Sequence, residues 1–324
     1  MELFLDTDLD SFFEIKEPVR VKHIPYWTAE VYGFGKYIRE YAAYPMTLPL
    51  CIDTDHGVAS TGVIYDNEIN SNAPVQFYHS PETVEQWRSR YKRPCFVLYS
   101  PFVFYRRKNK VERLPTASGT LVFPAHTTPE IDDVSDMEKY IGDLESLPEK
   151  YKPFSICMHY HDVNKGMHKI FLRKGYRVFS AGHPFDYNFM RNFYSILRSH
   201  RYSTSNMYMS CLFYSVEMGI PHFIYGNAPV LINNGDSNLE QGQYDFWTLP
   251  RVRMMSEIFQ GPFDNITAEQ MGLVQNDLGL TESTSRVKMS FLLYKSFFAY
   301  TAKKTMKVLS ESLKINFHRV KKLY

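Results

Sequence analysis

The feature that most constrains the fold is a regular alternation of short apolar runs and helical patterns between about residues 118 and 225. The runs that favour β-strands lie at 120–124, 154–158, 176–180 and 220–225. The stretches with helical patterns lie at 137–147, 165–174, 187–198 and 207–218. Strand and helix alternating at this spacing predict right-handed βαβ units on a parallel sheet. The sequence therefore predicts an α/β fold for this region.

The first 115 residues carry a weaker version of the same signal. Strand candidates lie at 46–52, 75–78 and 95–98, with a helical stretch at 83–90 before the last of them. This pattern predicts a second, smaller α/β unit. The segment 105–118 is charged and ends with Pro and small residues, which is typical of an interdomain connection.

On this basis we expect three parts along the 324 residues. They are an N-terminal α/β domain at 1–115, a Rossmann-like domain at 116–283 and a C-terminal helical segment at 284–324. After Gly226 the sequence is polar and typical of a loop through Gln243, and we expect helix from about Thr284 to the end.

Composition excludes several classes of protein. The 37 Lys and Arg residues nearly balance the 35 Asp and Glu residues, and a formal net charge of +2 argues against a nucleic-acid-binding protein. The four cysteines are widely spaced, which indicates neither a disulfide framework nor a zinc finger. The N-terminal sequence lacks the basic and apolar regions of a secretory signal, and no apolar run approaches about 18 residues. We therefore expect a cytoplasmic protein without a membrane-spanning segment.

The C-terminal segment has the pattern of an amphipathic, basic helix. Apolar residues recur at spacings of three and four at Met306, Leu309, Leu313, Phe317 and Val320. Between residues 295 and 324 there are eight Lys or Arg residues and one acidic residue. Two interpretations stay open: the helix packs its apolar stripe on the protein, or residues 295–324 bind an anionic membrane surface at the inner face.

Histidines follow four of the predicted strands. In open parallel sheets, ligands bind beyond the carboxyl ends of the strands, so polar residues at these positions are site candidates. The four groups are Asp53, Asp55 and His56; His126, Thr127 and Thr128; His159, His161 and Asp162; and His183 with Pro184. Any one histidine there can be structural, but the set as a whole indicates a site.

A fifth polar group precedes the helical stretch at 207–218. Its members are Ser203, Thr204, Ser205 and Asn206. Ser, Thr and Asn are common helix N-caps, and the N-terminus of a helix also offers free N–H groups to an anion. A histidine on a neighbouring strand, such as His183, can share a diphosphate with such a helix end.

These motifs resemble a known superfamily. Gly182-His183-Pro184, followed about twenty residues later by the Ser-Thr-Ser-Asn segment, then by Ser210 and by Gly219-Ile220-Pro221, is similar to the donor half of GT-B-type glycosyltransferases. Groups with such motifs include bacterial sialyltransferases, Kdo transferases and CDP-glycerol glycerophosphotransferases. In the N-terminal half, Asp55-His56-Gly57 and His79-Ser80-Pro81 are similar to segments of the glycerophosphotransferase-like group.

The resemblance implies a GT-B-like fold, with two Rossmann-like domains whose parallel sheets face a cleft. The N-terminal domain is then the acceptor side and the middle domain is the nucleotide-donor side. His183 and the segment from Ser203 to Ser210 are implied to hold the donor phosphates, and His56 is implied as a candidate base. The donor is expected to be a nucleotide-sugar, with a preference for a cytidine nucleotide. The expected activity is transfer of its sugar to a cell-surface polysaccharide or a lipid-linked glycan precursor.

The chemistry of these residue types agrees with such a transfer. A histidine with an ordinary pKa near 6.5 can take the proton of an acceptor hydroxyl at neutral pH, so His56 is the predicted base, oriented by Asp55 or Asp53. Charge on the departing nucleotide needs fixed hydrogen-bond donors. The predicted donor-site residues are His126, Thr127, Thr128, His161, His183, Pro184, Ser203, Thr204, Ser205, Asn206 and Ser210. No metal or other cofactor is then required.

Three alternatives stay open. A metallohydrolase would bind zinc or a similar ion through His159, His161 and Asp162. A metal-dependent GT-A-type transferase would use one of the Asp-x-Asp pairs, Asp6/Asp8 or Asp53/Asp55. A non-catalytic scaffold of the same fold would bind a nucleotide or saccharide, or assemble partners through the C-terminal helix.

Overall fold

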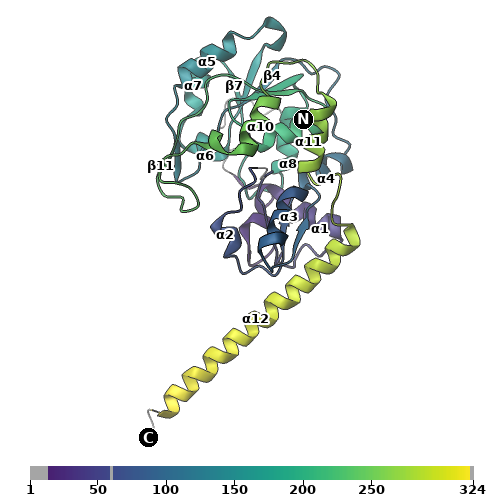
Figure 1. The fold of residues 1–324 in the computed structure, drawn as a ribbon, viewed down its shortest axis with the longest axis vertical. Helices are drawn as coiled ribbons and strands as arrows, with labels where there is room; N and C mark the ends of the chain where they lie inside the picture. Colours follow the sequence, from purple (N-terminus) through teal and green to yellow (C-terminus); the bar gives the residue numbers. More distant parts are fainter. Residues whose placement is uncertain (1–13, 59–60, 322–324) are drawn as a thin grey trace.

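The chain has an α/β architecture built on two parallel sheets (Figure 1). The structure, a computed structural model, describes the backbone of residues 14–58 and 61–321. It describes the side chains of the same residues except 308 and 311–321. The predicted fold class, α/β with two parallel sheets, is confirmed. The carboxyl ends of strands from both sheets face the middle of the molecule, where His56, His126 and His159 lie.

The larger sheet has five strands in the order β7-β6-β4-β8-β9, and every neighbouring pair is parallel. Its strands are β4 (Thr120–Phe123), β6 (Phe154–Cys157), β7 (Arg177–Phe179), β8 (Tyr202–Ser205) and β9 (His222–Ile224). Nearly all of their residues are buried, because helices cover both faces of a parallel sheet. From β4 the chain adds β6 and β7 on one side of the sheet and then β8 and β9 on the other side. This switch point between β4 and β8 creates a crevice of the kind in which open α/β sheets bind ligands.

The helices of this half follow the predicted alternation. They are α5 (Met137–Glu145), α6 (Tyr160–Asn164), α7 (His168–Arg173), α8 (Phe189–Leu197) and α9 (Ser210–Glu217). Helix α5 shows why such segments become helical. Asp136 caps it by accepting a hydrogen bond from the Lys139 amide, and Tyr140, Ile141 and Leu144 bury one face.

The smaller sheet is β1-β2-β3, also parallel. Its strands are β1 (Asp53–Thr54), β2 (Gln76–Tyr78) and β3 (Cys95–Val97), and the helices of this half are α1 (Phe34–Ala42), α2 (Asp66–Ile69), α3 (Pro81–Arg90) and α4 (Pro101–Lys108). The strand expected at 46–52 is wrong, since pairing begins only at Asp53. Pro49 has no N–H to donate to a ladder, which delays the strand until the chain has passed it.

Several other expectations need correction. Residues 203–205 belong to strand β8, in the interior of the sheet between β4 and β9, and the helix after them begins at Ser210 rather than at 207. The segment after Gly226 is not a continuous loop: β10 (Leu231–Asn233) and β11 (Gly242–Gln243) join β5 (Ile131–Asp133) in a small antiparallel sheet. Helices α10 (Pro250–Ile258) and α11 (Ala268–Asp277) come before residue 284. The first part of 105–118 completes helix α4.

The two halves share one hydrophobic core. Helix α4 contacts α1 on one side and α8 and α9 on the other. Within this contact, the ring of Phe102 stacks on Tyr214 with centroids 4.0 Å apart. Helix α11 packs against α9 and then leads back to the smaller sheet, where the Thr284 amide donates to the Val97 carbonyl. A domain boundary near residue 115 stays a prediction.

A buried ion pair lies where the two halves meet. Arg39 donates to both carboxylate oxygens of Glu30, at 2.5 and 2.9 Å, and also to the Leu48 carbonyl. Tyr187, from the larger half, donates its hydroxyl to Glu30 at 3.1 Å. All three side chains are buried. Because a charge without a partner is very unfavourable in such surroundings, these groups fix the relative position of α1 and the segment before α8.

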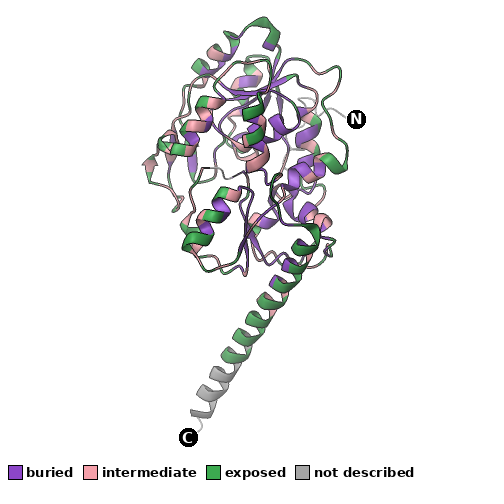
Figure 2. Cartoon of the chain, turned by 45° about the vertical axis from the view of Figure 1, so that its right-hand side comes forward, coloured by how far each residue is buried: buried purple, intermediate pink, exposed green. Residues whose placement is uncertain are grey.

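Helix α12 (Arg286–Lys321) begins on the protein and then extends away from it (Figures 1 and 2). Met289, Leu293 and Ser296 are buried where its first turns pack near α1. Met306 and Leu309 are exposed, so of the two interpretations left open, packing of this stripe on the protein does not hold for these two residues. The side chains of Leu313, Phe317 and Val320 lie outside the described residues. In the described part of the chain, no helix is both long enough and apolar enough to cross a bilayer.

Replacing Gly35 by Ala tests the buried ion pair. A Cβ atom at Gly35 lies 1.7 Å from Glu30 Oε2, so the Gly35→Ala variant has to displace the carboxylate from Arg39. We expect the free energy of unfolding to fall by about 3 kcal/mol or more, as when a buried ion pair is broken. Gly142→Ala, on the exposed side of α5 with no atom near its Cβ, is the control and should be neutral or slightly stabilising. Equal stability of the two variants in urea unfolding would contradict this role of the ion pair.

Candidate functional site

A cavity of about 200 Å³, here called the central cavity, lies between the two sheets. His56, which follows β1, lines it from the smaller half. His126 and His159, which follow β4 and β6, line it from the larger half. The structure thus brings together three of the predicted strand-end groups, because the carboxyl ends of both parallel sheets face the same space.

The three histidines that follow β4 and β6 form a cluster. The ring centroids of His126 and His159 are 4.7 Å apart, and those of His159 and His161 are 5.2 Å apart. Burial, together with the neighbouring His126 and His161, holds the pKa of His159 well below its ordinary value. Desolvation also lowers the pKa of His161. His159 is therefore a neutral imidazole at pH 7, and its ring can donate one hydrogen bond without carrying a charge.

Tyr32, from the smaller half, contacts this cluster across the cavity. Its hydroxyl lies 3.2 Å from His159 Nε2. Since His159 Nδ1 accepts the His161 amide, we assign the ring proton to Nε2, which donates to Tyr32. The backbone of Tyr32 has φ 57°, a left-handed conformation that is unfavourable outside glycine, and its amide donates to the Pro184 carbonyl at 2.5 Å. Desolvation raises the pKa of Tyr32 to about 12, so the hydroxyl stays protonated.

His183 lies at the edge of the same region. Its ring centroid is 4.7 Å from that of Tyr160, a lining residue of the central cavity. His183 Nδ1 accepts the Phe185 amide at 3.1 Å, which leaves Nε2 as the proton-bearing nitrogen. Desolvation lowers the pKa of His183. Pro184 is buried, and its carbonyl accepts the hydrogen bond from the Tyr32 amide.

The first residue of helix α9, Ser210, closes the cavity from the side. Ser210 Oγ accepts the Val58 amide at 3.0 Å, a contact between the two halves. A Cβ atom at Gly57 would lie 2.8 Å from the same oxygen, so glycine is needed beside His56 for this close approach. The N-terminus of α9 therefore points its partial positive charge at the cavity.

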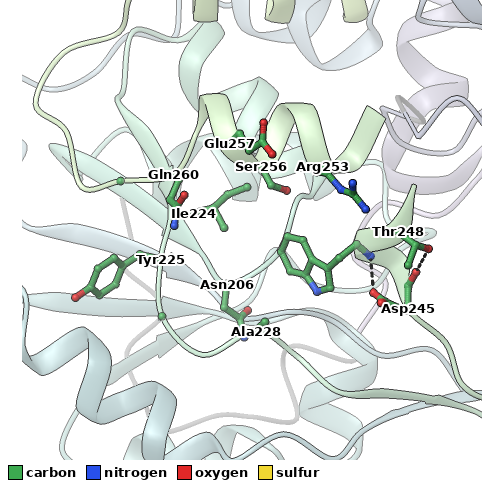
Figure 3. Close-up of a pocket in the computed structure, with 13 residues that line it drawn as sticks. Asn206, Ile224, Tyr225, Ala228, Asp245, Thr248, Arg253, Ser256, Glu257 and Gln260 are labelled. Atoms are coloured by element: carbon green, nitrogen blue, oxygen red, sulfur yellow. Dashed lines mark hydrogen bonds between the residues drawn. The ribbon is translucent and has the colours of Figure 1, made fainter. Parts of the chain in front are cut away.

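A larger cavity of about 570 Å³, the outer cavity, lies beyond the ends of β8 and β9 (Figure 3). Trp247, Arg253 and Glu257 line it, together with Asn206. Asn206 Oδ1 accepts the Ala125 amide at 2.8 Å, and Ala125 precedes His126 of the central cavity. The outer and central cavities are therefore neighbours across the crevice between β4 and β8.

The structure places other predicted residues away from the cavities. Ser203, Thr204 and Ser205 are buried in β8. Ser203 and Ser205 contact the two ring nitrogens of His222 at 2.9 and 3.0 Å, and Thr204 donates to the Phe223 carbonyl. Because these hydroxyls are already bonded inside the protein, they do not form the phosphate-binding segment at a helix N-terminus that the motif implied.

Thr127, Thr128 and Asp55 are also bonded elsewhere. Thr127 donates twice to Asp162, through its amide and its hydroxyl, both at 2.8 Å. The Thr128 hydroxyl donates a hydrogen bond to the exposed Glu130 carboxylate, and the Thr128 carbonyl accepts one from Lys165. The Thr128 side chain is therefore turned toward an exposed neighbour. Asp55 is buried against His79, with 2.6 Å between the carboxylate and Nδ1.

His56 is therefore oriented differently from the prediction. Asp53 Oδ1 accepts hydrogen bonds from the Thr28 hydroxyl and the Thr54 amide. Asp55 pairs with His79. The partners of both aspartates are thus residues other than His56. The ring of Trp27 lies beside that of His56 instead, with centroids 5.0 Å apart. Desolvation lowers the pKa of His56, and the charge of Asp55 partly opposes this effect.

A metallohydrolase would need a cluster of metal ligands. In the part of the chain that the structure describes, no group of three or more His, Cys, Asp or Glu residues is arranged to hold a metal ion. Asp162 in particular accepts two hydrogen bonds from Thr127. Asp6 and Asp8, the pair named for a GT-A-type enzyme, lie outside the described residues.

A third cavity, of about 430 Å³, opens on the other side of His56. We call it the N-terminal cavity. Trp27, Asp53 and Glu68 line it together with Tyr300 of α12. His56 lines both the central and the N-terminal cavity.

Comparisons with known proteins give weak matches. No protein-family model and no curated protein matches the sequence. A solved structure of the wall teichoic acid polymerase TagF matches 82% of this chain and 69% of that one, at 14% identity and a TM-score of 0.35. A putative UDP-N-acetylglucosamine 2-epimerase from Listeria monocytogenes matches 81% of this chain and 67% of its own, at 11% identity and a TM-score of 0.37. A UDP complex of MnaA from S. aureus matches 79% and 68%, at 10% identity and 0.35.

Some residues of these cavities have no strong signal in the sequence. Tyr32 follows no predicted strand, and only the neighbouring Gly33 and Gly35 mark its segment as unusual. Trp27 and Glu68 stand in regions without a clear periodic pattern. Their positions depend on the packing of the two halves, which short motifs do not encode.

Proposed function

We propose that the protein is a glycosyltransferase that takes a sugar from a nucleotide-activated donor. The observation that supports this most is the meeting of His56, His126 and His159 in one cavity between two parallel sheets. Such a cleft suits two substrates that must react while water is kept out. The short motifs shared with GT-B-type enzymes agree with this activity. We propose that the nucleotide of the donor is a cytidine nucleotide.

The donor nucleotide is proposed to span the outer and central cavities. Its base and ribose would lie near Trp247 and Arg253, and its phosphates would approach the crevice at Asn206. The leaving phosphate would then face three groups of the central cavity. They are His126, the N–H groups at the start of α9 and the hydroxyl of Tyr32. Hydrogen-bond donors and a helix end stabilise the charge that develops as the bond to the sugar breaks.

His56 is proposed as the general base. Its lowered pKa keeps the imidazole neutral at pH 7 and able to take a proton. The acceptor hydroxyl, bound in the N-terminal cavity, would give its proton to His56 as its oxygen bonds to the anomeric carbon. The bond between that carbon and the phosphate oxygen breaks, and its electron pair leaves with the nucleotide.

Helix α12 is proposed to bind an anionic membrane surface, where a lipid-linked acceptor would be found. Val287, Phe291 and Phe298 form a stripe on its exposed side, at 82%, 64% and 63% exposure. Between residues 286 and 307 the helix has six Lys or Arg residues and no acidic residue. A second copy of the helix would bring like charges together, whereas an anionic surface attracts them and accepts the apolar stripe.

Variants of the histidines separate donor binding from catalysis. A thermal-shift panel of CMP, CDP, UDP, GDP and their sugar conjugates should give one nucleotide that stabilises the protein by several degrees, since saturation at about 100 times Kd adds roughly 2.7 kcal/mol. His126→Ala should lose this shift. His56→Asn should keep it but reduce sugar transfer by about 100-fold or more. Val134→Ser, at an exposed residue that lines none of the three cavities, is the control and should match the wild type. No shift with any nucleotide would contradict the proposal.

Sedimentation with vesicles tests the role of α12. The wild type should bind vesicles of phosphatidylglycerol and phosphatidylcholine but not vesicles of phosphatidylcholine alone. The double variant Phe291→Ser/Phe298→Ser should lose most of this binding, because it removes the largest exposed apolar groups of the helix. Val134→Ser removes an apolar residue that is 58% exposed far from α12, and it should bind like the wild type. Binding that is equal in all three proteins would refute the membrane proposal.

A further inference from the structure

The N-terminal cavity is built from four separate parts of the chain. Tyr26 and Trp27 precede α1, Thr54 ends β1, and Glu68 belongs to α2. Tyr300 reaches it from α12, where its hydroxyl lies 3.0 Å from His23 Nε2. A space of about 430 Å³ is enough for one or two sugar units.

The charged groups at the cavity wall are carboxylates. Asp53 and Glu68 line it, and none of its described lining residues is a lysine or arginine. Arg93 is close by, but its guanidinium donates to the Ser71 and Glu68 carbonyls and to the Gln76 side chain at 3.2 Å. A phosphate or carboxylate in this cavity would therefore face like charge without an available cation.

The remaining wall combines aromatic faces with polar atoms that suit hydroxyl groups. Trp27 is 49% exposed beside His56, and Tyr26, Tyr65 and Tyr300 complete the aromatic surface. Thr54 is 1% exposed, and its Oγ1 has no hydrogen-bond partner in the described part of the protein. A buried hydroxyl without a partner is unfavourable, so a ligand hydroxyl at this position would stabilise the bound state.

We propose that the N-terminal cavity binds the acceptor through a sugar unit that carries no phosphate or carboxylate. The apolar face of the sugar ring stacks on Trp27, and its hydroxyl groups bond to Asp53, Glu68 and Thr54. An amino group on the sugar is favoured further, because a cation is attracted both by the carboxylates and by the aromatic faces. The inference rests on the proposed function only in naming this ligand as the acceptor.

Saturation-transfer NMR with matched sugars tests the inference without any donor. The probes are glucosamine with glucosamine 6-phosphate, and trehalose with trehalose 6-phosphate, on the full chain at pH 8. Burial raises the pKa of Glu68 to about 7, so its carboxylate is charged under these conditions. We expect the unphosphorylated member of each pair to bind at least about tenfold more tightly.

Three variants locate the binding. Trp27→Ala should lose the signal of the unphosphorylated sugars, whereas Trp27→Phe, which keeps an aromatic face, should retain it. Glu68→Gln should reduce the discrimination against phosphate severalfold, since it removes one like charge. Equal binding of phosphorylated sugars, binding that survives in Trp27→Ala, or no binding of any probe would overturn the inference. Because nucleotides are absent from this experiment, such a failure leaves the donor proposal to its own thermal-shift test.

Discussion

The arrangement of the whole molecule depends on the buried contact among Glu30, Arg39 and Tyr187. Two charges taken out of water are favourable only when they meet each other and further hydrogen-bond partners, and here the Leu48 carbonyl and the Tyr187 hydroxyl complete the set. The contact joins α1 to the segment that follows β7. Tyr32 lies between Glu30 and α1, and its strained backbone is held by this frame so that its hydroxyl reaches His159. The position of one half relative to the other therefore determines the shape of the central cavity.

Three neighbouring cavities follow from this frame, and each has a different chemistry. The outer cavity has Trp247 beside charged groups, the central cavity has histidines and a helix end, and the N-terminal cavity has carboxylates and aromatic rings. A nucleotide, a leaving phosphate and an uncharged sugar suit these surroundings in that order. His56 lies between the last two, where a proton must move if the acceptor is to attack. This order of surroundings supports the proposed transfer across the cleft.

The sequence predicts the larger sheet well because its strands are continuous apolar runs between clear helical patterns. The histidines after β4 and β6 are predictable for the same reason, since a strand end fixes where the next side chain lies. Strand β8 is missed because Ser203, Thr204 and Ser205 are polar. Their hydroxyls find partners inside the core, at the His222 ring and the Phe223 carbonyl. The pairing of Asp55 with His79, and the approach of Tyr32 to His159, depend on contacts between distant segments. Periodicity and motif spacing contain no information about such contacts.

The most direct test of a shared nucleotide site is the NMR spectrum of the histidine rings during titration with CDP and, separately, UDP. The account predicts that the ring signals of His126 and His159 move with one common dissociation constant. His200 and His222 lie outside the three cavities, and their signals should stay in place. Nucleotide binding that moves His200 or His222 but leaves His126 and His159 unchanged would contradict the account.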